Sequence, residues 1–239
     1  MYAKPDRTSL KKIASVVLIL IVIPVTIMLG TMVFDGRKYY IISLLIIIYT
    51  LIPFFMIFES RKPKAREIVI IAVLVAIAVA GRAAFFMFPQ VKPIVALVII
   101  TGVSLGAESG FLMGALTAFV SNFFAGQGPW TPWQMFAFGI IGFLAGILFK
   151  EGRLPKTKTM LCIFGAVSTM AIFGIIMNIS SVLTFSETVT FQMLIASCAA
   201  GLPFDAIHAV STVAFLFIFA KPMIKKIERI KQKYGIVEN

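Results

Sequence analysis

The chain has 239 residues, of which 60% are hydrophobic and only 13% are charged, and its mean hydropathy is +1.01. Soluble domains carry about 25% charged residues, and several apolar runs here approach the ~20 residues that a helix needs to cross the hydrocarbon core of a bilayer. The composition therefore excludes an ordinary soluble domain and predicts an all-α integral membrane protein.

Apolar runs predict eight membrane segments in chain order. The first two, at 13–34 and 39–58, form an N-terminal two-helix part within residues 1–60, and the other six form a core over residues 61–239. The core segments are expected at 68–88, 93–105, 111–125, 132–149, 159–183 and 203–220, with a short apolar stretch at 191–202 before the last. Since 93–105 and 111–125 are too short to cross as straight helices, we expect them to extend into loops or to lie inside the bundle.

The basic residues indicate how these segments are oriented. Of the 22 Lys and Arg residues, 18 lie before the first segment, between the second and third, between the sixth and seventh, or after the last. All these places are on one side, and the positive-inside bias makes that side cytoplasmic, so we predict a multi-pass cell-membrane protein with both termini in the cytoplasm. Topology signals and contacts with lipid headgroups account for the net charge of +12, so we predict no nucleic-acid partner.

One loop stands out between the fifth and sixth segments. The stretch SNFFAGQGPWTPWQMF holds both tryptophans, Trp130 and Trp133, and two glycines and two prolines within residues 126–132. Proline and glycine restrict the shape of a turn, and indoles supply large flat surfaces. Two interpretations remain: an external turn with its tryptophans in the interfacial aromatic belt, or a rigid wall of a ligand pocket.

Polar residues from several segments are predicted at one depth near the outer face. They are Arg82, Asn122, Gln134, Asn178, Asp205 and His208. Because a charge inside a bilayer is costly, such residues usually pair or serve a function. One alternative is an Arg82–Asp205 ion pair that locks the bundle, and another for His208 is a hydrogen-bonded core histidine. We predict instead an externally open substrate site made of Arg82, Phe85, Asn122, Trp130, Trp133, Gln134, Asp205 and His208.

The sequence gives no sign of a metal centre or an enzyme. One histidine and two separated cysteines make no metal site, and no catalytic cofactor is expected. Asp205, His208 and Ser211 share one helix face, but no nucleophile motif such as GxSxG accompanies them.

Small residues recur at every fourth position in four segments. Ala72, Ala76, Ala80 and Ala84 form such a row, which favours close approach of another helix, either from a partner subunit or within this chain. Glycines recur likewise at 102, 106, 110 and 114 and at 142 and 146, where we expect packing inside the bundle.

From about Arg66 onward the chain resembles the substrate-binding S-component of an energy-coupling factor (ECF) vitamin transporter. Three stretches carry the resemblance: AVLVAIAVAGRAAF, then SNFFAGQGPWTPWQM, and GLPFDAIHAVST followed by KPMIKKIERI. The resemblance is closest to the cobalamin or corrinoid type. It covers six segments, so the two N-terminal segments are an addition to the usual six-helix bundle.

The resemblance implies a bundle that captures a vitamin at the outer face and associates with a transmembrane coupling subunit and two cytoplasmic ATPase subunits. Ala72, Ala76 and Ala80 would face the coupling subunit. The chain has no P-loop pattern, so energy must come from a partner or a gradient. The alternative is a stand-alone secondary transporter of a small organic solute, although Asp205 is the only clear intramembrane acid and no inverted repeat is visible.

The predicted topology can be tested by labelling single cysteines in intact cells. A cysteine at Gln127 should react with a membrane-impermeant maleimide, and one at Lys156 should react only after the cells are opened. Labelling of position 156 from outside, or no labelling of position 127, would contradict the topology.

Overall fold

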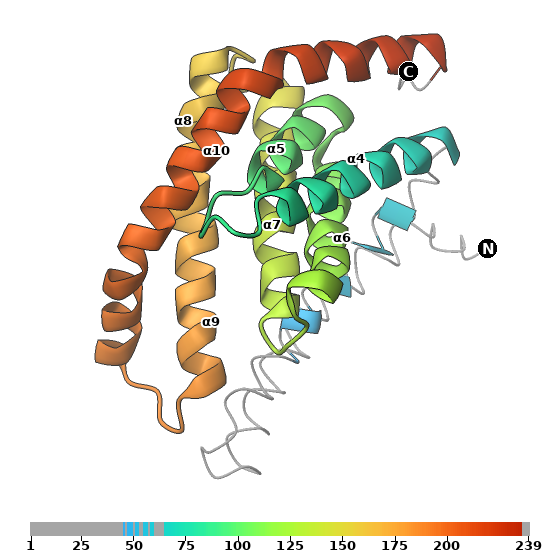
Figure 1. Ribbon diagram of the computed structural model, residues 1–239. Coiled ribbons are helices and arrows are strands. Elements are labelled where there is room, and N and C mark those ends of the chain that lie inside the picture. The colour runs from blue at the N-terminus through green and yellow to red at the C-terminus, as the bar shows by residue number, and fades with distance from the viewer. Residues whose placement is uncertain are drawn as a thin grey trace, which may run out of the picture.

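Figure 1 shows the computed structural model of the chain. It describes residues 65–235 continuously and, before them, only the isolated positions 45, 47–49, 51, 52, 55, 56, 58 and 59. The predicted segment at 13–34 and most of that at 39–58 therefore lie outside the described residues.

The described residues are almost entirely helical and contain no strand. The helices are α4 (Ala65–Ala84), α5 (Ile94–Leu105), α6 (Ala107–Ala125), α7 (Thr131–Ala145), the π-helix η2 (Gly146–Lys150), α8 (Lys158–Ser168), the π-helix η3 (Thr169–Gly174), α9 (Ile175–Phe185) and α10 (Phe191–Lys233). Among them, four continuous helical stretches are long and apolar enough to cross a membrane: α4, α7 with η2, α8 through α9, and α10. The predicted all-α membrane class is confirmed.

Residues 191–220 form part of one helix, which corrects the predicted separation at Pro203. The helix α10 begins after Thr190, whose side chain accepts a hydrogen bond from the amide of Met193, and continues for 43 residues. Proline usually interrupts a helix because it lacks an N–H group, but Pro203 and Pro222 are both accommodated inside α10. Figure 1 shows α10 turning in its C-terminal part to run across one end of the bundle.

The C-terminal part of α10 is tied to the beginning of α4. Arg66 donates a hydrogen bond to the carbonyl oxygen of Tyr234 at 2.8 Å, and its guanidinium lies over the same tyrosine ring. Nearby, Lys231 donates to the carbonyl oxygen of Ser104 at the end of α5. This basic C-terminal segment therefore closes the end of the bundle at which α4 starts and α5 ends.

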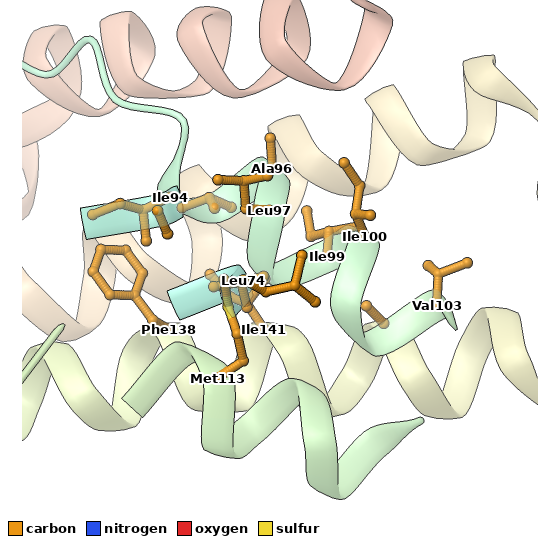
Figure 2. Close-up of a cluster of buried hydrophobic side chains, with 14 of the residues drawn as sticks. Leu74, Ile94, Ala96, Leu97, Ile99, Ile100, Val103, Met113, Phe138 and Ile141 are labelled. Carbon is orange, nitrogen blue, oxygen red and sulfur yellow. The ribbon is translucent and has the colours of Figure 1, made fainter. Parts of the chain in front are cut away.

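The core is built around α5. All 12 residues of α5 are buried, which is possible because the helix carries no charged residue. Figure 2 shows its side chains meeting Leu74 of α4, Met113 of α6, and Phe138 and Ile141 of α7. The expectation that 93–105 lies inside the bundle is confirmed, and the segment predicted at 111–125 extends into its preceding loop, as expected, and begins at Ala107.

Glycines allow α5, α6 and α7 to approach one another closely. A side chain at Gly110 of α6 would collide with the backbone of Gly142 in α7, and one at Gly114 would collide with the backbone of Phe138. A side chain at Gly102 of α5 would likewise meet the carbonyl oxygen of Gly142. The glycine repeats thus pack inside the bundle, as predicted.

Enlarging one of these contacts should destabilise the protein. We expect Gly110→Ala to lower the free energy of unfolding by about 1–3 kcal/mol, because the added methyl group meets backbone that cannot rotate away. For a chain of this size that corresponds to a drop of roughly 5 °C in Tm, measured by thermal unfolding in detergent. Ala196→Val, which also enlarges a helical side chain but at an exposed position, should leave Tm nearly unchanged. Equal Tm values for the two variants would refute the packing argument.

Candidate functional site

Asn122 is the centre of a polar network inside the bundle. Its side chain is completely buried near the end of α6. The Asn122 oxygen accepts a hydrogen bond from Arg82 of α4 at 2.8 Å, and its amide donates to Gln134 Oε1 and Thr131 Oγ1 of α7, each at 2.9 Å. Arg82 also donates to the Ser121 hydroxyl. The structure therefore brings three of the predicted site residues, Arg82, Asn122 and Gln134, into one network.

The network continues into the tryptophan loop, residues Gly126–Trp130. The Thr131 hydroxyl donates to Gln127 Oε1 at 2.8 Å and accepts from the amide of Gly128. The Trp130 ring lies directly over Gly128, where a larger residue would collide with it, and its indole N–H donates to the carbonyl oxygen of Gly126. Proline at the first turn of α7 fixes the exit of the loop. The loop thus has a defined shape, and Trp130 holds it.

A groove opens beside the tryptophan loop. It has a volume of about 700 Å³ and is mainly apolar. Its lining comes from the ends of α6 and α9, the start of α7 and the loop: Ile48, Phe119, Gln127, Gly128, Pro129, Thr131, Pro132, Met135, Thr184 and Phe185. None of the predicted site residues lines this groove. Trp130 faces the loop and Phe185, and the centroids of the Trp130 and Phe185 rings are 6.5 Å apart. Trp133 is half-buried in the first turn of α7.

Asp205 interacts with α9 instead of Arg82. Its carboxylate accepts a hydrogen bond from the Asn178 amide at 2.9 Å. Gly174 of η3 makes room for this carboxylate, and Gly201 makes room for the Asn178 side chain. The alternative of an Arg82–Asp205 ion pair is therefore wrong, because both residues are described and each is engaged elsewhere. Asn178, which the predicted site did not include, is the partner of Asp205.

His208 lies one turn further along α10 and is completely buried. The edge of Phe173 in η3 packs against its ring, with centroids 4.9 Å apart and planes at 87°. Both ring nitrogens lack a hydrogen-bond partner in the structure, so the alternative of a hydrogen-bonded core histidine is not what the described residues show. Buried polar groups without partners are rare and often belong to functional sites. The adjacent π-helix is also a feature that recurs at functional sites.

The connection from α4 to α5 passes beside His208. Phe85, a predicted site residue, packs edge-on against Phe215 of α10, with centroids 5.3 Å apart. The amide of Lys92 donates to the Ser211 hydroxyl at 3.0 Å, three residues beyond His208 on α10. The site predicted from the sequence did not include Lys92. Its place directly before Pro93, between two apolar segments, was the signal that could have marked it.

The described residues contain no catalytic or metal-binding cluster. No group of three or more His, Cys, Asp and Glu side chains comes together among them. Asp205, His208 and Ser211 share a helix face but make separate contacts, since Asp205 accepts from Asn178 and Ser211 binds the backbone of Lys92. This arrangement lacks the connected nucleophile, base and acid of a hydrolase triad.

The alanine row lies on the surface. Ala72, Ala76 and Ala80 are all exposed, and so are Val73 and Ile77 beside them. The opposite face of α4, with Ile71, Leu74 and Ala78, is buried in the core. Packing of the alanine row within the chain, one of its two interpretations, is therefore not what the described residues show.

Comparison with known proteins identifies the family. The model of the family described as "ECF transporter, substrate-specific component" matches residues 66–220. A UPF0397 protein of Vibrio atlanticus (strain LGP32) is 27% identical over 135 residues, which are 54% of this chain and 73% of that protein. No solved structure matches the chain significantly. The family match covers more than half of the chain and begins in the first turn of α4, so this protein belongs to the substrate-specific components of ECF transporters.

Proposed function

We propose that this protein captures a vitamin or related micronutrient at the outer face of the cell membrane and delivers it to an ECF transport complex. One observation carries the proposal: a polar network of Arg82, Asn122 and Gln134, with His208 buried nearby, lies inside an apolar bundle of this family. Binding sites for small molecules usually combine apolar walls with a few placed polar groups. The family is one of transporter components and not of enzymes.

The aromatic residues would supply the walls of this site. Phe85 lies between the polar network and α10, and Trp130 and Trp133 lie at the end of the network nearest the loop. Asp205 would take part through its contact with Asn178. In this proposal a bound ligand lies between the network and α10, below the tryptophan loop.

A corrinoid such as cobalamin is the ligand that the sequence resemblance favours. Cobalamin is a large molecule, so it would need the loop and the groove beside it as well as the buried network. Isothermal calorimetry of the purified protein with cobalamin tests this part of the proposal directly.

The exposed alanine row would be the contact with the coupling subunit. Small side chains let two membrane helices approach closely. Ala72, Ala76 and Ala80 present such small side chains on the exposed face of α4. The two ATPase subunits would then supply the energy through the coupling subunit. Both termini would lie in the cytoplasm, as the distribution of Lys and Arg predicts.

The proposal is tested by uptake into cells or proteoliposomes. The protein together with a coupling subunit and two ATPase subunits should import its ligand with ATP, and removal of ATP or of either ATPase should stop import. Import by the isolated protein, driven by an ion gradient, would instead favour a stand-alone secondary transporter.

Widening the alanine face should separate coupling from binding. We expect Ala76→Trp to abolish ATP-dependent uptake in the complete complex, because the indole prevents close approach of the partner helix, while ligand affinity of the isolated protein stays within about twofold. Ala196→Trp, at an exposed position of α10 away from α4, serves as the matched control and should retain uptake. If Ala76→Trp loses binding as well, the row supports the bundle and not the coupling contact.

Removing both indoles should weaken ligand binding. Stacking on an indole contributes on the order of 1 kcal/mol per ring beyond burial, so Trp130→Ala with Trp133→Ala should lower affinity about tenfold or more. Calorimetry on the purified variant measures the loss, and Phe191→Ala, an exposed aromatic position at the start of α10, is the control. An unchanged Kd would assign the tryptophans to the interfacial aromatic belt.

A further inference from the structure

We propose that the ligand carries an anionic group, a carboxylate or a phosphate, which binds between Arg82, Lys92 and His208. This inference rests on the proposed function and goes further, since it names the chemical class of the substrate. The three residues come from different parts of the chain: the last turn of α4, the loop before α5, and the middle of α10.

Backbone contacts bring Arg82 and Lys92 together. Gly81 packs against the ring of Pro93 so closely that any side chain at Gly81 would collide with it. Arg82 follows Gly81 and Lys92 precedes Pro93, so the two cations lie on either side of one contact.

Lys92 is also held against α10. Its amide donates to the Ser211 hydroxyl at 3.0 Å, and that hydroxyl donates back to the Lys92 carbonyl oxygen at 3.4 Å. His208 precedes Ser211 by three residues, so the two side chains share one face of α10. The Lys92 backbone is therefore anchored beside His208. From there the Lys92 ammonium group can reach the surroundings of the His208 ring.

None of these groups has an anionic partner among residues 65–235. Within that part of the chain, Arg82 bonds only to the neutral oxygens of Ser121 and Asn122, and no hydrogen bond or ion pair engages the Lys92 ammonium group. His208 is completely buried with both nitrogens unpartnered. Arg82 and Lys92 are both half-buried, and a cation held in a membrane bundle without a counter-charge is costly and usually marks a substrate or ion pathway.

Neither Asp205 nor the buried Glu67 supplies the missing charge. The Asp205 carboxylate is engaged by Asn178 and lies against Gly174. Glu67 accepts a hydrogen bond from Ser109 near the opposite end of α4, 15 residues from Arg82 and therefore about 22 Å away along the helix. An anionic ligand would complete the site: Arg82 and Lys92 donate charge-assisted hydrogen bonds to it, and a neutral His208 donates one more.

The first experiment identifies what the protein binds. The protein is purified from cells grown in rich medium, depleted of lipid by detergent exchange, and denatured, and the released small molecules are identified by mass spectrometry. We expect one water-soluble compound with a carboxylate or phosphate, at close to one molecule per protein. A neutral or cationic compound would overturn the inference, and so would a phospholipid as the only anion released.

The second experiment tests the site with matched variants. Lys92→Gln should lower occupancy by the copurifying compound about tenfold or more, because a charge-assisted hydrogen bond is lost. Lys92→Arg keeps the charge and should retain most of the occupancy, and Lys156→Gln, an exposed lysine before α8, should behave as the unmodified protein. Equal occupancy of Lys92→Gln and Lys156→Gln would overturn the inference.

A third measurement does not depend on any variant folding. The unmodified protein is titrated with the identified compound and with its neutral form, the primary amide of a carboxylate or the dephosphorylated alcohol of a phosphate. The neutral form should bind at least tenfold more weakly, and equal affinity would contradict the proposed site. In that case ATP-dependent uptake of the compound by the complete complex would show that the proposed function stands without the anionic site.

Discussion

The close approach of α6 to α7 is the contact on which the rest of the structure depends. Gly110 and Gly114 on one helix meet the backbone of Gly142 and Phe138 on the other, so the two axes lie nearer than side chains would permit. Lipid tails are as apolar as leucine, so burial of apolar side chains does not drive helices together in a bilayer. Helices associate there through tight van der Waals contacts such as these. The same approach sets Asn122 of α6 opposite Gln134 of α7, where the polar network begins.

The helical bundle followed from the apolar runs, whereas the side-chain partners did not. Apolar runs predicted the helical bundle, and glycine spacing predicted its internal contacts, because both depend on residues near in sequence. The partner of Arg82 depends on tertiary contacts between distant segments. Asp205 was the obvious candidate by charge, yet Arg82 binds Ser121 and Asn122, and Asp205 binds Asn178. The continuous course of α10 through Pro203 was also missed, since local sequence favours a break there.

The candidate site divides into a satisfied part and an unsatisfied part. Around Asn122 each polar group has a partner, so this part shapes the tryptophan loop and holds Arg82 in position. At His208 both ring nitrogens lack a partner among the described residues, which is the arrangement expected where a ligand completes the hydrogen bonding. Lys92 belongs to the second part through its contact with Ser211. A rigid part beside an unsatisfied part is how a preorganised binding site is built.

The short central helix has a consequence for how the protein is made. The 12 residues of α5 extend over only about 18 Å, well below the ~30 Å hydrocarbon thickness, and a single residue, Gly106, separates α5 from α6. As it emerges from the ribosome, α5 alone is too short to insert into the membrane as a stable span. It has to partition together with α6 and become enclosed once α7 and α10 arrive. Biogenesis of this bundle is therefore coupled to tertiary assembly.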